Sequence, residues 1–323
     1  LLDTGRTNRV AAELIERRVG PALEAFSIRR AEVTVPDLRG RFDFLLEHRH
    51  TGEELLLEVK SCTLFNGRYA MFPDAVTDRG ARHVAELAGT DRRAALLFVV
   101  HSDRPDRFLP DYHTDLEFSR TLFEARDRLP IFAVGVRWNR RLGIEAVRPH
   151  LEIPWEILPP LLEDRGSYLI LLRLDSDRTI TTGALGEVRY PAGHYLYVGS
   201  AQKGLTARIN RHRRGNARRK HWHIDYLREQ ATFVDAYAIR EPLRREAEIV
   251  RELRQIADDA VPGFGSSDST EASHLLTFSQ DPRRQREFQQ AVLGLRRYGV
   301  EGLPAGGGGM PVSCTRLGAH PKS

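Results

Sequence analysis

The stretch RFDFLLEHRHTGEELLLEVK, residues 41–60, decides the fold of the N-terminal part of this chain. Residues 41–47 and 55–60 are rich in apolar residues, and the polar segment between them contains Gly52, a pattern that predicts two strands joined in a β-hairpin. Around the hairpin, helical and strand-like patterns alternate as far as about residue 145, as in a sheet flanked by helices. The sequence therefore predicts a mixed α/β domain built on this hairpin.

The hairpin also predicts an acidic pair beside a lysine. A turn centred between His50 and Thr51 places Asp43 directly opposite Glu58, and Lys60 projects from the same face two residues further on. Like charges opposite one another destabilise a strand pair, so a divalent cation or a shared proton is expected between them. Mg²⁺ or Mn²⁺ suits such oxygen ligands, and a lysine beside the metal can activate water for phosphodiester hydrolysis. The alternative is a solvated strand face.

The segment FPDAVTDRGARH, residues 72–83, strengthens the hydrolytic interpretation. Together with the runs DFLL, residues 43–46, and EVKSCTL, residues 58–64, it resembles the sugar fermentation stimulation protein A (SfsA) family over residues 1 to about 137. The resemblance implies a PD-(D/E)XK nuclease domain, a restriction-endonuclease-like core. In such a domain the acidic pair and the lysine of the hairpin are the catalytic residues.

Three further residues of this half are candidates for the same site. The opening segment looks like the family's first nuclease helix, where Glu13 could add a carboxylate on the metal side, although an exposed helical glutamate often meets only solvent. Arg79 and His83 lie near a helix start after Thr77, an expected N-cap, where they could contact phosphate. A solvated first turn is the alternative for both.

Prolines at positions 149, 154, 159 and 160 exclude a regular helix between the two halves of the chain. The sequence predicts five segments: a nuclease domain at residues 1–148, a linker at 149–165, a second domain at 166–280, a polar segment with helical potential at 281–303, and a disordered, glycine-rich tail at 304–323.

The second domain begins with two predicted strands, GSYLILL at residues 166–172 and HYLYVGS at residues 194–200, followed by a helix from about Leu205. From Lys203 to Lys220 the chain carries eight basic residues and no acidic one, a pattern that indicates phosphate binding or, alternatively, a solvated basic face. The residues expected to contact nucleic acid here are Lys203, Arg211, His212, Arg213, Arg214, Arg218, Arg219, Lys220, His221 and His223.

Residues 244–257 are predicted to form a helix whose apolar residues line one stripe, and Glu246 lies on that stripe. A glutamate on the inward face requires a partner, and a metal ion or an arginine is the simplest one. The alternative is a glutamate that reaches water at the end of the stripe.

These elements together resemble the Uri-type branch of the GIY-YIG nuclease superfamily over residues 166 to about 278. The resemblance implies that Tyr168 and Tyr197 position or deprotonate the attacking water, that Arg208 stabilises phosphate charge and that Glu246 holds a divalent metal. This chain has Ser167 where the superfamily has isoleucine, and Ser269 and Ala247 where the branch has cysteines. The blocks that carry the resemblance are GSY at 166–168, YVG at 197–199, HWHIDYL at 221–227, GFGSSD at 263–268 and SHL at 273–275.

Composition excludes several other classes of protein. The 323 residues are 41% hydrophobic and carry 49 basic and 44 acidic side chains, a net charge of +5, as in ordinary soluble proteins. Only two cysteines are present, Cys62 and Cys314, which excludes a disulfide framework. The longest uncharged apolar run, residues 94–100, is far shorter than a membrane span, and no signal peptide is visible, so a cytoplasmic location is expected.

The sequence thus predicts a mixed α/β (α+β) protein of two domains, each a small mixed sheet flanked by helices. Its predicted function is a divalent-metal-dependent endonuclease that hydrolyses DNA, or RNA, at two separate sites. The alternative is a nucleic-acid-binding or regulatory protein in which one or both sites are inactive.

Overall fold

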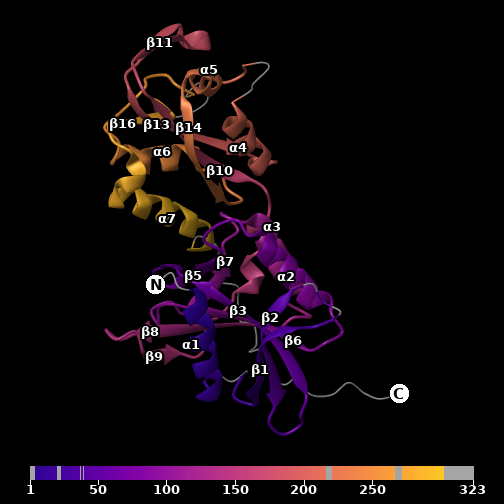
Figure 1. Ribbon diagram of the computed structural model, residues 1–323. Coiled ribbons are helices and arrows are strands. Elements are labelled where there is room, and N and C mark those ends of the chain that lie inside the picture. Colours follow the sequence, from indigo (N-terminus) through magenta and orange to yellow (C-terminus); the bar gives the residue numbers. More distant parts are fainter. Residues whose placement is uncertain are drawn as a thin grey trace. The chain divides into compact units, whose positions relative to one another are not determined.

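The computed structural model describes residues 4–19, 23–36, 38, 40–215, 220–265 and 271–301 (Figure 1). They form two compact units, which meet in the sequence at Leu158 and Pro159. Both units are sheets covered by helices, which confirms the predicted mixed α/β class. The predicted tail, residues 304–323, lies outside the described residues, as do Arg218, Arg219 and Ser269.

The first unit is built on a six-stranded sheet in the order β1-β2-β3-β6-β8-β9. Strand β6 is buried along its whole length, which its uninterrupted apolar sequence AALLFVV explains, and it pairs in parallel with β3 and β8. The strands are β1 (Phe26–Thr34), β2 (Arg41–His48), β3 (Glu54–Cys62), β6 (Ala94–Val100), β8 (Ile131–Trp138) and β9 (Ile144–Arg148), beside a small sheet of β4 (Leu64–Asn66), β5 (Tyr69–Phe72) and β7 (Arg107–Pro110).

Helices cover both faces of this sheet. Helix α1 (Thr4–Glu16) packs its apolar residues into one core, whereas α2 (Asp78–Gly89) and α3 (Leu116–Ala125) pack into the other. Helix α2 begins as predicted, because the Thr77 side chain accepts a hydrogen bond from the Gly80 N–H and so satisfies one free donor of the first turn.

The predicted hairpin register is confirmed. Strands β2 and β3 pair antiparallel, with Phe44 opposite Leu57 and Leu46 opposite Leu55. Continued by one residue, this register places Asp43, just before Phe44, opposite Glu58, just after Leu57. The strand alternation also places Glu58 and Lys60 on one face.

Residues 149–165 are packed rather than extended. Leu151 is fully buried in the core of the first unit, and two short 3₁₀ turns follow, η1 (Trp155–Ile157) and η2 (Pro159–Leu161). Each turn begins at or directly after a proline, because a proline fits the first position of a helical turn but not its interior.

The second unit is a five-stranded sheet in the order β14-β10-β13-β16-β15. Each of its strand pairs is antiparallel, so parallel pairing among the described strands is confined to the first unit. The strands are β10 (Gly166–Leu174), β13 (Gly193–Ala201), β14 (Thr232–Arg240), β15 (Asp259–Ala260) and β16 (Leu275–Phe278), beside a hairpin of β11 (Arg178–Thr181) and β12 (Glu187–Tyr190) that encloses η3 (Gly183–Leu185).

Two pairs of helices cover the two faces of this second sheet. One face packs against α4 (Leu205–Arg214) and α5 (His223–Gln230), and it carries Tyr168 and Tyr197. The other packs against α6 (Glu246–Arg254) and α7 (Arg286–Glu301), which follows the short turn η4 (Pro282–Arg284). Among the described residues, no helix combines the length and the apolar character that crossing a bilayer requires.

Candidate active sites

The first candidate site contains Asp43 on β2 and Glu58 and Lys60 on β3. One carboxylate oxygen of Asp43, Oδ2, accepts a hydrogen bond of 2.7 Å from the backbone N–H of Val59, and the other, Oδ1, accepts one of 2.7 Å from the Asn8 amide on α1. Burial and the nearby carboxylate of Glu58 raise the pKa of Asp43. The two carboxylates are therefore close enough to oppose each other's charge, as the register predicts.

Glu58 is only 4% exposed, yet just one of its oxygens is paired within the described part of the chain. Its Oε1 lies 2.6 Å from Nζ of Lys60 and 3.0 Å from Nδ1 of His83. Its Oε2 is buried and has no partner among the described residues. A buried carboxylate oxygen without a partner, beside a second carboxylate, is a donor set that fits a divalent cation.

His83 does not face open solvent. It is 7% exposed, and its ring bridges Glu58 and the Nε of Arg79, which lies 3.5 Å from the second ring nitrogen. In the structure His83 contacts Glu58, and its expected contact with phosphate stays a prediction. Asn8 is a site residue that sequence reasoning missed, because nothing in the local pattern connects a helical asparagine to a strand aspartate 35 residues away.

The structure does not bring Glu13 to the acidic pair. Its carboxylate contacts the guanidinium of Arg17, one turn further along α1. Glu13 follows Asn8 by five positions, which is about 140° around a helix, so it faces away from Asp43 while Asn8 faces toward it. The expected role of Glu13 on the metal side is not supported by this position.

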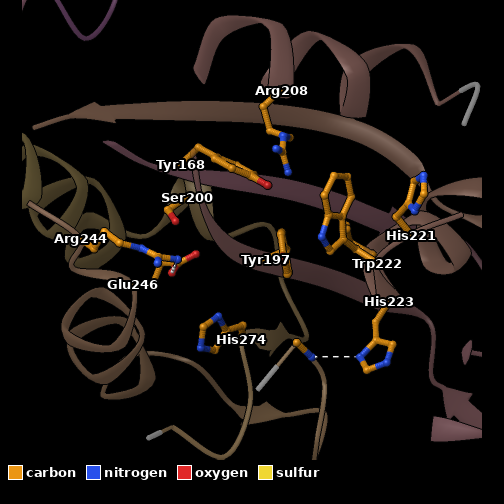
Figure 2. A pocket seen from close by; sticks show the side chains of 12 residues that line it. Tyr168, Tyr197, Ser200, Arg208, His221, Trp222, His223, Arg244, Glu246 and His274 are labelled. Carbon is orange, nitrogen blue, oxygen red and sulfur yellow. Dashed lines mark hydrogen bonds and ion pairs between the residues drawn. The ribbon is translucent and has the colours of Figure 1, made fainter. Parts of the chain in front are cut away.

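The second candidate site is a pocket of about 320 Å³ in the second unit (Figure 2). Four elements bring together its predicted catalytic residues, Tyr168 from β10, Tyr197 from β13, Arg208 from α4 and Glu246 from α6. Sequence reasoning did not assign three further lining residues, Ser200, Arg244 and His274. The remaining lining residues are His221, Trp222, His223, Ile224 and Gly265.

The two tyrosines lie side by side, with ring centroids 6.2 Å apart. Gly199, opposite Tyr168 in the β10–β13 register, makes this possible, because a β-carbon at that position would lie 2.6 Å from the Tyr168 ring. Burial raises the pKa of Tyr168 well above its usual value, and Figure 2 shows the Arg208 guanidinium directed toward its hydroxyl. The Tyr168 phenol is therefore protonated at neutral pH.

The predicted nucleic-acid contact of His212 is wrong. His212 is 2% exposed, because it continues the buried stripe that Leu205 and Ile209 form on α4. Its Nε2 lies 3.1 Å from the Tyr168 hydroxyl, and burial lowers the pKa of its imidazole to about 4. His212 is thus a neutral hydrogen-bond partner inside the unit.

The other predicted basic contacts divide into exposed and paired residues. Lys220 and Arg211 are paired, with Glu229 at 2.6 Å and with the buried Asp225 at 2.7 Å. The Nδ1 of His223 accepts a hydrogen bond of 3.1 Å from the backbone of Gly265. The exposed residues of the set are Lys203, Arg213, Arg214 and His221.

Glu246 has an arginine partner, one of the two that its inward position predicts. Its carboxylate lies 3.5 Å from the guanidinium of Arg244, and the side chain stays 22% exposed at the pocket. Across the pocket floor, the Nε2 of His274 is buried and has no partner among the described residues. His274 lies in the SHL run just before β16, one of the blocks that carry the family resemblance, and this is the signal that could have singled it out.

Within the described residues, no group of three or more histidine, cysteine, aspartate or glutamate side chains is arranged to hold a metal ion. The first site offers two carboxylates and the second offers one. A cation in either site would therefore take its remaining ligands from water and from substrate oxygens, which is how Mg²⁺ is usually bound.

Two family models match the chain. "Sugar fermentation stimulation protein RE domain" covers residues 5–141, and "Domain of unknown function DUF123" covers residues 167–297. Neither description names a GIY-YIG domain.

Two curated relatives carry the name "Sugar fermentation stimulation protein homolog". The one from Pyrobaculum arsenaticum is 36% identical over 160 residues, which are 46% of this chain and 67% of the relative, and the one from Methanosphaera stadtmanae is 40% identical over 129 residues, which are 39% and 52%. The solved structure of Pyrococcus furiosus SfsA in complex with Ca²⁺ is 30% identical and covers 47% of this chain and 66% of that one, with a TM-score of 0.43. The chain thus spans about half to two thirds of the length of these relatives.

Proposed function

Because the chain belongs to the sugar fermentation stimulation protein family through its N-terminal half, we propose that this half is a divalent-metal-dependent nuclease, restriction-endonuclease-like in its PD-(D/E)XK core. We further propose that the pocket of the second unit is a separate nuclease site of the GIY-YIG type. The observation that carries the first proposal is the buried Oε2 of Glu58, which has no partner among the described residues and lies beside Asp43 and Lys60.

In the first site, separate residues would bind the cation and orient the attacking water. Asp43 and Glu58 would hold Mg²⁺ or Mn²⁺, which when bound would supply Lewis-acid stabilisation of charge on the phosphate. The Asn8 amide and the Val59 N–H hold the Asp43 carboxylate in place. Lys60 and His83 both contact Oε1 of Glu58, so its Oε2 is left to bind the cation. The Lys60 ammonium orients the attacking water and offsets negative charge on the phosphate.

In the second site the raised pKa of Tyr168 favours positioning of the water over its deprotonation. With the His212 proton on Nδ1, the Tyr168 hydroxyl donates to Nε2 and its own oxygen lone pairs stay available to a water molecule. Tyr197 lines the pocket beside it, Arg208 neutralises charge on the phosphate, and Glu246 would hold one divalent cation.

The substrate is a nucleic acid, because the basic residues of α4 and of the pocket suit a phosphate backbone, and DNA is favoured because the family model over residues 5–141 describes a restriction-endonuclease-like (RE) domain. RNA has the same backbone charge and is the second substrate to test. The competing function is nucleic-acid binding without hydrolysis. It predicts binding that weakens steeply with salt and survives chelation of metal ions.

The test is cleavage of labelled single-stranded and double-stranded DNA and RNA, with Mg²⁺, Mn²⁺ or a chelator. The proteins compared are the wild type, Glu58→Gln, Glu246→Gln and the double variant. Glu54→Gln and Glu252→Gln are matched controls, since Glu54 lies on β3 with Glu58 and Glu252 lies on α6 with Glu246, and both lie outside the two sites.

We expect each single variant to lose one metal-dependent activity and the double variant to lose both, with the controls unchanged. Wild-type protein that binds nucleic acid but cuts none of the substrates would establish the binding function instead. A double variant that still cuts would show that the catalytic residues lie elsewhere.

A further inference from the structure

Trp222 is a large apolar side chain that the second unit leaves in the open. It lines the pocket and is 38% exposed, although its neighbours Ile224 and Leu227 on the same helix are buried. Exposed aromatic area at the mouth of a charged pocket is unfavourable in water and is typical of a surface that binds a ligand. The position of Trp222 is therefore informative about what the pocket takes.

The backbone that carries Trp222 is held rigidly. The N–H groups of His221 and Trp222 both donate to Oδ2 of Asp225, over 2.9 and 3.2 Å. The Asp225 carboxylate is buried, and the same oxygen lies 2.7 Å from the guanidinium of Arg211. These hydrogen bonds and the arginine lower the pKa of Asp225, so the carboxylate is ionised at neutral pH and keeps all three partners.

Two arginines of α4 contact the indole ring. The guanidinium carbons of Arg208 and Arg211 lie 4.3 and 4.6 Å from its centroid. Both arginines belong to α4 and are three residues apart, so they reach the ring from the same helix face. The ring is thus held by two cation–π contacts, and 38% of the Trp222 residue stays exposed.

The charge around Trp222 favours a polyanion. The pocket contains Arg208, Arg244 and three histidines but a single carboxylate, Glu246. Figure 2 shows the indole beside the Arg208 guanidinium, with Glu246 on the opposite side of the view. A phosphate bound by Arg208 would have its attached nucleoside within reach of the ring.

We propose that Trp222 is a stacking platform for an unpaired nucleobase, so that this pocket takes single-stranded nucleic acid or a nucleotide unpaired at the cleavage point. The inference rests on the proposed function of the pocket. In a duplex both faces of each base are covered by neighbouring bases, whereas a single strand offers an open face to an aromatic ring. Stacking tolerates all bases, so little sequence preference is expected.

The test is binding in the presence of a chelator, where no hydrolysis occurs. A labelled 12-nucleotide single strand and the duplex of the same sequence are titrated into wild-type protein, Trp222→Ala and Trp222→Phe, with Leu142→Ala as a control that removes an exposed apolar side chain from the first unit. We expect Trp222→Ala to bind the single strand roughly 10- to 100-fold more weakly, with Trp222→Phe between it and the wild type and duplex binding changed less than about threefold.

Tryptophan fluorescence reports on the pocket without relying on the alanine variant. The single strand should quench wild-type emission, and most of the quenching should be absent in Trp222→Phe. Equal affinity of wild type and Trp222→Ala for the single strand overturns the proposal, as does quenching that is the same in wild type and Trp222→Phe. Equal losses for single strand and duplex also overturn it.

These outcomes are separate from those of the cleavage test. A protein that cuts nucleic acid but shows no Trp222-dependent binding keeps the nuclease function and loses the stacking platform. A protein that cuts nothing but shows Trp222-dependent binding of the single strand keeps the platform and loses the catalytic assignment.

Discussion

The hydroxyl oxygen of Tyr168 lies 3.1 Å from Nε2 of His212, and both side chains are almost completely buried. Burial pushes the two pKa values apart, raising that of the phenol and lowering that of the imidazole to about 4. The pair is therefore neutral at pH 7, and the hydrogen bond joins an uncharged donor to an uncharged acceptor. This pair links the buried face of α4 to the wall of the pocket.

Replacing His212 should impair the second site without removing any residue that lines it. In His212→Phe the Tyr168 hydroxyl loses its partner, at a cost of about 1–3 kcal/mol, and the hydroxyl is no longer held in one orientation. We expect roughly tenfold slower cleavage with a smaller change in substrate affinity. Single-turnover kinetics measure both quantities. In Tyr168→Phe the further substitution of His212 should have little effect, because the interaction is already lost.

The same histidine predicts how stability depends on pH. The folded-state pKa of about 4 lies below the ordinary histidine value of 6.5, so between these two pH values the unfolded chain takes up a proton that the folded chain resists. Stability from this group is complete above about pH 6.5 and falls as the pH drops toward 4, by an amount on the order of 3 kcal/mol. Denaturant unfolding of wild type and His212→Phe at several pH values tests this. The difference between them should shrink as the pH falls, and a constant difference would contradict the expected shift.

Gly199 is required for the two tyrosines to lie side by side. In Gly199→Ala the new β-carbon would lie 2.6 Å from the Tyr168 ring and 2.9 Å from that of Tyr197, so at least one ring must move. We expect a destabilisation of about 1–3 kcal/mol and a loss of cleavage by the second site. Gly89→Ala is the control, because its added methyl group meets no atom within 4 Å. Thermal unfolding and cleavage assays should separate the two variants clearly.

The first site predicts a metal effect that can be measured without catalysis. The test uses the Glu246→Gln variant as its background, because this change removes the carboxylate of the second site. In that background Mn²⁺ should raise the unfolding temperature, since a ligand at 100 times its dissociation constant adds about 2.7 kcal/mol to the free energy of unfolding. The further change Glu58→Gln should abolish this shift. In chelator, Glu58→Gln should change stability little, because the substitution removes both the charge that opposes Asp43 and the ion pair with Lys60. An unchanged shift in Glu58→Gln would place the metal elsewhere.

The sequence was sufficient where the fold depends on a local pattern. The turn around Gly52 determines the register of β2 and β3, and this register brings Asp43 and Glu58 together. The order of the strands in the second sheet could not be predicted in this way, because β10 pairs with β14 and β13 through contacts between distant segments.

Contacts across elements were the least predictable part of each site. Asn8 reaches Asp43 from a helix 35 residues away, and His83 turns inward to Glu58 although a histidine in the first turns of a helix can equally face solvent. His212 continues the apolar stripe of α4, but its burial depends on how closely that helix packs against the sheet. Helical periodicity indicates which face a residue occupies but not how close the opposing strand comes.

His274 offers a way to separate function from stability. Its Nε2 is buried at the pocket without a partner among the described residues, and such a nitrogen costs about 1–3 kcal/mol of folding free energy. His274→Leu removes the nitrogen and keeps a side chain of similar bulk, so we expect stability to be equal or higher while cleavage by the second site falls about tenfold or more. His194→Leu is the matched control, since His194 on β13 also has a buried ring nitrogen without a described partner but does not line the pocket. Loss of stability in His274→Leu with unchanged cleavage per folded molecule would show that this histidine serves the core rather than the substrate.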